Sequence, residues 1–188
     1  MKILGIVGSL RRDAYNAMLM RAAAELLPPD TELVVFEGLS GIPAFDEDLE
    51  DGPAPDAVTA LKEAIDEADG VLIATPEYNG SIPGFLKNAL DWVSRPFEDN
   101  PLRNKPAAVL GASTGMFGAV WAQADLRKVL GLIGARVLER DTPVGLATMR
   151  FGAGGELADP ETREAVGQTI EALAEMVRER EAYLADAA

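Results

Sequence analysis

The sequence contains no cysteine and no histidine. Without cysteine, the chain has no disulfide, no thiolate nucleophile, no iron–sulfur cluster and no zinc–sulfur site. Without histidine, it lacks the most common general base and the most common metal ligand of proteins. Any redox or transfer chemistry must therefore come from a cofactor or from carboxylate, Lys, Tyr, Ser and Arg side chains, and we assign no catalytic side chain and no metal ligand.

Long apolar runs are also absent. None approaches the roughly 18–20 residues that span a bilayer, and residues 1–7 are too short for the core of a signal peptide, so we expect a cytoplasmic protein. The chain carries 31 acidic and 17 basic residues, a net charge of −14, which argues against nucleic acid and anionic membranes as partners. Its 188 residues predict a single domain, residues 1–188, with a substantial core.

Apolar segments of strand and helix type alternate along the chain. Short apolar runs predict strands at residues 2–7, 33–36, 71–74, 107–110 and 136–138. Helical spacing of apolar residues predicts helices around residues 19–26, 58–68, 86–93, 126–133 and 166–177. This alternation predicts a parallel sheet covered on both faces. Such sheets bind ligands beyond the carboxyl ends of their strands, which points to the loops at residues 8–16, 75–80 and 112–118.

The first of these loops reads GSLRRDAYN, residues 8–16. A strand-to-helix turn presents free backbone N–H groups and the positive end of a helix dipole, which together favour a phosphate. Ser9 and Asn16 add neutral hydrogen bonds, and Arg11 adds a planar cationic group. The spacing matches neither the dinucleotide fingerprint nor the nucleoside-triphosphate loop. Taken alone, the stretch could also be an ordinary polar connection.

The third loop reads GASTGMFG, residues 111–118. It contains the G-x-S-x-G pattern of a hydrolase nucleophile, but such a serine needs an imidazole and the chain has none. Its glycines instead allow the backbone to approach a flat ligand closely, with Ser113 as a donor. A tight turn without a ligand is the alternative.

The middle loop begins TPEYNG, residues 75–80. Pro76 and Gly80 set an unusual backbone course, Glu77 and Asn79 offer hydrogen-bonding groups, and Tyr78 offers a rigid aromatic surface. A purely structural loop has little use for an exposed tyrosine between a glutamate and an asparagine. We therefore expect this loop to contact a ligand.

The stretches GSLRRDAYN, TPEYNGSIPGFLKNALDW and GASTGMFGAVWAQADLR together resemble the NADPH-dependent FMN reductase family, which includes quinone, chromate and azo-compound reductases. The resemblance is strong over residues 2–140 and weak in the last helix. It implies a flavodoxin-like α/β fold: a doubly wound, five-stranded parallel sheet of order 2-1-3-4-5, with helices on both faces, assembled as a homodimer or homotetramer.

The resemblance also implies a bound FMN cofactor. Its phosphate would be held by Ser9, Arg11, Tyr15 and Asn16. Its isoalloxazine ring would be bordered by Pro76, Glu77, Tyr78, Asn79 and Gly80, and on the other side by Ser113, Gly115, Met116 and Phe117.

The chain departs from the family pattern at several of these positions. Ala14 stands where a phosphate-binding serine is common, and Asp13 places an anion beside it or caps the helix. Thr114 stands where proline is usual. Ala119 and Trp121 replace residues that are more often glycine and arginine, so Trp121 is expected to alter the pocket or an interface, or to lie in the core.

These features predict an FMN-dependent oxidoreductase that passes electrons from NADPH or NADH, through FMN, to a small acceptor: a quinone, a flavin, an azo compound or chromate. Both substrates would use the same flavin face, which predicts ping-pong turnover. The alternatives are a flavodoxin-like electron carrier reduced by a protein partner and a non-catalytic redox-sensing module. Candidates for binding the extra phosphate of NADPH are Arg103, Lys105, Arg127, Lys128 and Arg150.

The acidic stretch FDEDLED, residues 45–51, lacks the spacing and the central glycine of an EF-hand. We interpret it as a solvated loop or part of a subunit contact, not a cation site.

Overall fold

The computed structural model describes residues 1–50 and 52–187 of the chain. Its sheet is formed by β1 (Lys2–Val7), β2 (Glu32–Phe36), β3 (Gly70–Thr75), β4 (Pro106–Ala112), β5 (Arg136–Val137) and β6 (Pro143–Val144). The strand order is β2-β1-β3-β4-β5, with β6 also paired to β4, and these pairings are parallel. The predicted flavodoxin-like order 2-1-3-4-5 is therefore confirmed.

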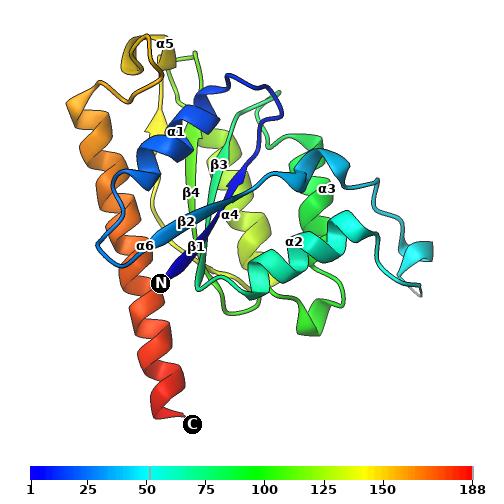
Figure 1. Cartoon of the computed structure of the whole chain (residues 1–188). Coiled ribbons are helices and arrows are strands. Elements are labelled where there is room, and N and C mark those ends of the chain that lie inside the picture. The colour runs from blue at the N-terminus through cyan, green and yellow to red at the C-terminus, as the bar shows by residue number, and fades with distance from the viewer. Residues whose placement is uncertain (51, 188) are drawn as a thin grey trace.

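Helices cover both faces of this sheet (Figure 1). They are α1 (Tyr15–Ala24), α2 (Asp56–Asp66), α3 (Gly84–Val93), α4 (Val120–Ile133), α5 (Ala147–Arg150) and α6 (Pro160–Asp186). Three short 3-10 turns are η1 (Gly38–Gly41), η2 (Glu47–Leu49) and η3 (Phe97–Asp99). Helices α1 and α6 share one apolar core with the sheet, and α2, α3 and α4 share the other. The doubly wound arrangement follows from apolar strands that need cover on both sides.

Burial falls from the centre of the sheet to its edge. Every residue of β3 and β4 is buried, which explains why these strands read as continuous apolar runs. The edge strand β2 alternates between exposed and half-buried positions. The loops that follow β3 and β4 therefore start from the most completely packed strands of the sheet.

The fifth strand position is split, which the sequence analysis did not predict. Strand β5 pairs with the beginning of β4, and β6 pairs with its end. Just before β6, the backbone N–H of Thr142 donates to the Gln123 side chain (3.0 Å), and the Thr142 hydroxyl bonds that of Thr169 (2.6 Å). These buried side-chain bonds tie the segment between β5 and β6 to α4 and α6. Neither β6 nor α5 carries enough residues for a periodic pattern.

Helix α6 begins with Pro160, and the Asp159 carboxylate accepts from the N–H of Thr162 (2.9 Å) as a helix cap. Its last buried residue is Val177, and the final turns project past the sheet in Figure 1. Among residues 1–50 and 52–187, no helix combines the length and the apolar character that crossing a membrane requires.

Candidate functional site

The strand register brings the three predicted loops to one edge of the sheet. Val7 pairs with Ala74, and Thr75 pairs with Gly111, so β1, β3 and β4 end side by side. We call the following segments loop 1 (residues 8–14), loop 2 (residues 76–83) and loop 3 (residues 113–119), and their shared edge the rim. At the start of loop 1, a Cβ added to Gly8 would lie 3.4 Å from Cδ of Pro76, the first residue of loop 2. Loops 1 and 2 therefore start in close contact.

Loop 1 leads into α1 without a side-chain cap. The N-cap residue is Ala14, and the first turn contains no acidic residue. The interpretation of Asp13 as a cap is wrong, because Asp13 precedes the N-cap position and the described part of the chain shows no side-chain hydrogen bond that caps α1. The N–H groups of Tyr15 and Asn16 likewise find no acceptor there. The start of α1 thus presents free donors and a positive dipole end, which favour an anion.

Two predicted phosphate ligands flank this helix start. Ser9 is half-buried and Arg11 is exposed, and the Arg11 guanidinium carbon lies 6.0 Å from the centre of the Tyr15 ring. The aromatic ring of Tyr15 packs in turn against Phe151, with 5.6 Å between ring centroids. Arg11 therefore lies near the free N-terminus of α1, and its guanidinium lies over the ring of Tyr15, the first residue of that helix.

Asn16 has a different environment from the other predicted ligands. It is 2% exposed. Its Nδ2 donates to the carbonyl of Ala112 (3.0 Å), and its Oδ1 accepts from the N–H of Ala112 (2.9 Å). The side chain thus satisfies both backbone groups at the end of β4, as a neighbouring strand would. Asn16 holds the start of α1 against loop 3 through these bonds.

Loop 2 contains a tight hairpin turn. The N–H of Tyr78 donates to the carbonyl of Ser81 (3.0 Å), and the N–H of Ser81 donates to the carbonyl of Tyr78 (3.2 Å). Between them, Asn79 has φ 54° and Gly80 has φ 77°, the conformation of a type I′ turn, for which Asn-Gly is the preferred pair. The turn presents Tyr78 at its base, with the side chain 52% exposed.

Glu77 fixes loop 2 to helix α4. Its Oε2 accepts from the backbone N–H groups of Trp121 (3.0 Å) and Ala122 (3.1 Å). The N-cap residue of α4, Ala119, has no side chain that can accept a hydrogen bond, so Glu77 supplies the cap from another loop. Ser81 adds a second tie, because its hydroxyl donates to Asp125 in α4 (2.5 Å). Sequence spacing could not reveal either tie.

Loop 3 is fastened to the chain segment around β6. The N–H of Ser113 donates to the carbonyl of Val144 (3.1 Å), and the N–H of Leu146 donates to the carbonyl of Gly115 (2.8 Å). The N–H of Ala147 donates to the carbonyl of Ser113 (3.0 Å). Because Phe151 packs on Tyr15, the short helix α5 bridges loop 3 and α1. Figure 1 shows α5 beside the start of α1.

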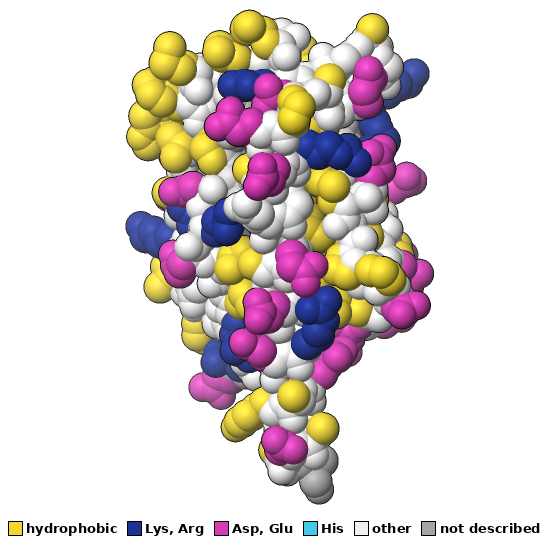
Figure 2. Space-filling model, turned by 90° about the vertical axis from the view of Figure 1, so that its left-hand side faces the viewer, with side chains coloured by type: hydrophobic (Ala, Val, Ile, Leu, Met, Phe, Trp, Pro, Cys, Tyr) yellow, Lys and Arg dark blue, Asp and Glu magenta, His cyan; other side chains and the backbone are white. Residues whose placement is uncertain are grey.

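Apolar side chains of loop 3 face solvent at the rim. Met116 and Phe117 are exposed, and Phe117 meets Trp121 edge to face, with 5.1 Å between ring centroids. Trp121 is itself exposed, so its interpretation as a core residue is wrong. Figure 2 shows hydrophobic side chains gathered at the same end of the molecule as α5.

Two of the cations proposed to bind the extra phosphate of NADPH lie far from the rim. Arg103 and Lys105 precede β4 and are therefore at the opposite edge of the sheet. Lys105 is buried, and its Nζ donates to the carbonyls of Asp66 (3.1 Å) and Ala68 (2.6 Å) at the end of α2. Burial lowers the pKa of the Lys105 ammonium, and the nearby charge of Arg180 lowers it further. Lys105 stabilises the end of a helix.

The remaining three candidates follow loop 3 in the chain and lie on α4 and α5. The Arg127 guanidinium pairs with Asp141, and that of Arg150 pairs with Asp159 at 2.6 Å. Lys128 lies exposed on α4. Engaging a nucleotide phosphate with either arginine would require it to leave or share its carboxylate.

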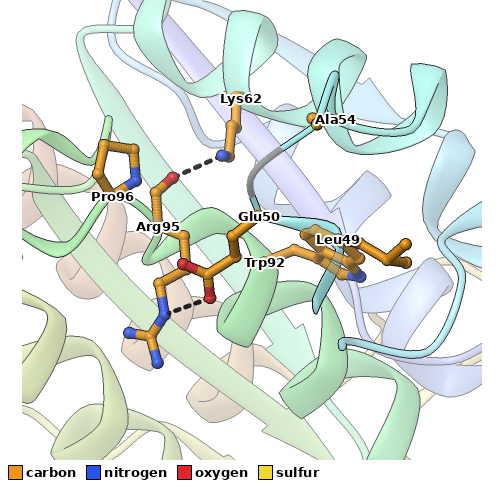
Figure 3. Close-up of a pocket in the computed structure, with 8 residues that line it drawn as sticks. Leu49, Glu50, Ala54, Lys62, Trp92, Arg95 and Pro96 are labelled. Carbon is orange, nitrogen blue, oxygen red and sulfur yellow. Dashed lines mark hydrogen bonds and ion pairs between the residues drawn. The ribbon is translucent and has the colours of Figure 1, made fainter. Parts of the chain in front are cut away.

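A separate cavity of about 290 Å³ lies at the end of α3, lined by residues between 49 and 62 and between 92 and 96 (Figure 3). Trp92 and Arg95 line it. The Arg95 Nε donates to Glu50 (3.1 Å), and the Lys62 Nζ donates to the carbonyl of Arg95 (2.5 Å). The chain's own groups therefore satisfy the charged side chains of Arg95 and Lys62 beside this cavity.

The acidic stretch at residues 45–51 folds onto the same helix. The N–H of Phe45 donates to Asn88 (2.7 Å), and its ring meets Trp92 edge to face at 5.1 Å. Asp51, the last residue of the stretch, lies outside the described residues. Within the described ranges, no cluster of three or more carboxylates could hold a metal ion.

Comparison with known proteins gives one consistent result. Residues 1–148 match the family model described as NADPH-dependent FMN reductase. The chain is 43% identical to an NAD(P)H-dependent FMN reductase of Pseudomonas aeruginosa, over 94% of this chain and 95% of that one. It is 38% identical to a 2-hydroxy-1,4-benzoquinone reductase of a Burkholderia species, over 96% and 98% of the two chains. The structure resembles a flavoenzyme NAD(P)H:(acceptor) oxidoreductase of Paracoccus denitrificans, with a TM-score of 0.83 and 34% identity, covering 95% of this chain and 97% of that one.

Proposed function

Because the chain belongs to the NADPH-dependent FMN reductase family, and is thus an oxidoreductase that uses FMN and NAD(P)H, we propose that it reduces small quinones at the rim formed by loops 1, 2 and 3. The observation that carries this proposal is the strand register, which places the ends of β1, β3 and β4 side by side. Ligands of open parallel sheets bind at this edge.

The start of α1 fits the phosphate of FMN. The free N–H groups of Tyr15 and Asn16, the uncapped helix end and the exposed Arg11 form an anion site. Ser9 adds a hydroxyl at the same turn. The Asn16 side chain supports this site indirectly, because it ties the helix start to Ala112.

Loops 2 and 3 fit the ring of FMN. Tyr78, Met116 and Phe117 present exposed apolar surface at the rim, and a flat aromatic ligand gains by covering such surface. We propose that Pro76, Glu77, Asn79, Gly80, Ser113 and Gly115 complete this border. In that set, Glu77 acts by positioning loop 2 against α4, and Asn79 and Gly80 act by setting its turn.

Bound FMN supplies two-electron transfer from a nicotinamide to a second substrate, which the side chains of this protein cannot perform. The residues of the chain bind the two substrates in turn and hold them against the rim. Because the rim is a single surface, nicotinamide and acceptor compete for it, which gives ping-pong turnover.

A neutral quinone is the acceptor that the surface supports best. The rim exposes thioether, phenyl and indole groups, which favour apolar aromatic molecules. The Burkholderia relative is named for a benzoquinone. We propose NADPH as the preferred donor, as in the name of the family.

Two measurements test this function. Titration of the protein with FMN should quench flavin fluorescence, and anaerobic stopped-flow mixing with NADPH should bleach the yellow complex rapidly. Steady-state assays with NADPH and a benzoquinone should then give parallel double-reciprocal lines. A yellow protein that NADPH does not bleach would point to an electron carrier, and a protein that cannot bind FMN would point to a non-catalytic module.

We further propose that residues 1–188 form one FMN-binding domain and that the protein is a cytoplasmic homodimer or homotetramer. Exposed Trp121 and Leu132, both on α4, support assembly, because large apolar side chains on one helix favour an interface. Light scattering on the purified protein reports the assembly directly. A mass equal to one chain would refute it.

A further inference from the structure

Sulfur chemistry in this chain depends entirely on methionine. The sequence contains six methionines and no cysteine. Met149 is 76% exposed and Met116 is 72% exposed, the two highest values among the large hydrophobic side chains of residues 1–50 and 52–187. Met20 is 1% exposed, and the other methionines are half-buried. Two thioethers are therefore far more accessible than the rest.

Both exposed methionines lie on segments that are bonded to each other at the rim. Leu146, three residues before Met149, donates its N–H to Gly115, next to Met116. A Cβ added to Gly145 would lie 2.1 Å from the carbonyl oxygen of Met116, so the two backbones are in direct contact. Met149 itself lies on α5, which bridges loop 3 and α1. The pair thus flanks the surface proposed to receive FMN and the acceptor.

Exposure of these side chains does not stabilise the fold, because an apolar group left in water gains no burial energy. A thioether does have a chemistry that leucine or isoleucine lacks. Peroxides convert it to a sulfoxide, and the flexible apolar side chain becomes polar. In a chain without thiols, accessible thioethers are the groups that respond to such an oxidant.

We propose that Met149 is a site of oxidation by hydrogen peroxide and that its oxidation reduces the affinity of the rim for apolar quinones. In this step the Sδ atom of Met149 attacks one peroxide oxygen and the O–O bond breaks. A sulfur–oxygen bond forms, the sulfur loses two electrons, and the remaining oxygen leaves as water. Two electrons and two protons supplied by a sulfoxide reductase would reverse the change. This inference rests on the proposed quinone reductase function.

Met116 and Met149 should differ in how bound FMN affects them. Met116 belongs to loop 3, which is proposed to border the flavin, so FMN should shield its sulfur. Met149 lies on α5, outside the three loops, and should remain accessible while it contributes apolar surface to the acceptor. Oxidation of Met149 should therefore change the KM for an apolar quinone without changing the affinity for FMN.

The first test maps the oxidation itself. The full-length protein, with and without bound FMN, is treated with limiting hydrogen peroxide, and peptide mass spectrometry follows all six methionines. Met149 should be oxidised about tenfold faster than buried Met20 in both forms. Met116 should match Met149 without FMN and be slowed when FMN is bound. Oxidation of Met149 no faster than that of half-buried Met18 and Met176 would overturn the inference.

The second test measures the consequence. After peroxide treatment of the FMN-bound protein, in which Met116 is shielded, the KM for an apolar benzoquinone should rise by roughly three- to tenfold, while fluorescence titration after removal of FMN should give an unchanged Kd for FMN. The variant Met149→Leu should show no such rise, and Met176→Leu, a half-buried control on α6, should respond like the natural protein. An unchanged KM at full Met149 oxidation would refute the effect.

The two tests separate this inference from the function on which it rests. If the untreated protein turns over no quinone, the proposed acceptor is wrong, and the predicted rise in the KM for quinones is wrong too. If Met149 resists peroxide in a protein that reduces quinones, the modification site alone is wrong. If FMN does not slow the oxidation of Met116, the placement of Met116 beside the isoalloxazine ring is wrong. The conclusion about the oxidation of Met149 would not change.

Discussion

Replacement of Glu77 by alanine should destabilise the protein, because its carboxylate caps α4 from a different loop. The substitution removes the acceptor of two N–H groups, at 3.0 and 3.1 Å, and a negative charge at the positive end of a 14-residue helix. Loss of a cap costs about 1 kcal/mol and the charge–dipole attraction about 0.3–1 kcal/mol. With the second N–H bond added, we expect a loss of about 2 kcal/mol in the free energy of unfolding.

Thermal unfolding of the FMN-free protein, followed by circular dichroism, measures this loss. For a domain of this size, 1 kcal/mol shifts Tm by about 2–4 °C, so the Glu77→Ala variant should unfold about 4–8 °C below the natural protein. Glu77→Gln keeps an oxygen that accepts both bonds and loses only the charge, so its Tm should fall by about half as much or less. Glu63→Ala, at an exposed position of α2, should stay within about 0.5 kcal/mol. A Glu77→Ala variant as stable as Glu63→Ala would refute the capping role.

Three further predictions concern other parts of the structure. Asn16→Ala leaves both buried backbone groups of Ala112 unpaired and should cost about 2–4 kcal/mol in urea unfolding; a cost below about 1 kcal/mol would contradict the tie. Arg11→Gln should weaken FMN binding by about tenfold or more in fluorescence titration, while the neighbouring Arg12→Gln should change it little; equal effects would contradict a specific phosphate contact. Since burial lowers the pKa of Lys105 in the folded state, the unfolded chain binds more protons in the window just below the usual lysine pKa of about 10.5. The stability of the natural protein relative to Lys105→Met should therefore rise as pH increases through that window, and a constant or falling difference in urea midpoints would refute this sign.

The fold was predictable because its central strands leave little ambiguity. Strands β3 and β4 are buried along their whole length, so they appear in the sequence as apolar runs between clear helical patterns. The split fifth strand and helix α5 were not predictable, since each consists of two to four residues. Their positions are determined by bonds such as that from Thr142 to Gln123, which connect residues far apart in the sequence.

The candidate site was predictable in its location and less so in the roles of its residues. Loops after parallel strands meet at one edge whatever their sequence, which placed all three stretches correctly side by side. The spacing of residues in the sequence could not show which polar side chains are available to a ligand and which bond to the protein's own backbone. The Asn16 amide and the Glu77 carboxylate bond to backbone groups 96 and 44–45 residues away, and only the folded chain reveals those partners.

This division of roles explains why the middle loop has its particular composition. Within it, Glu77 fixes the loop to α4, and Asn79 and Gly80 adopt the positive φ angles of a type I′ turn. Tyr78 is the member whose side chain stays largely exposed at the rim. Three of these four residues thus act on the shape of the loop and one offers a surface to a ligand. A loop built in this way is rigid before any cofactor arrives, so binding a flat ring at the rim costs little additional ordering of the chain.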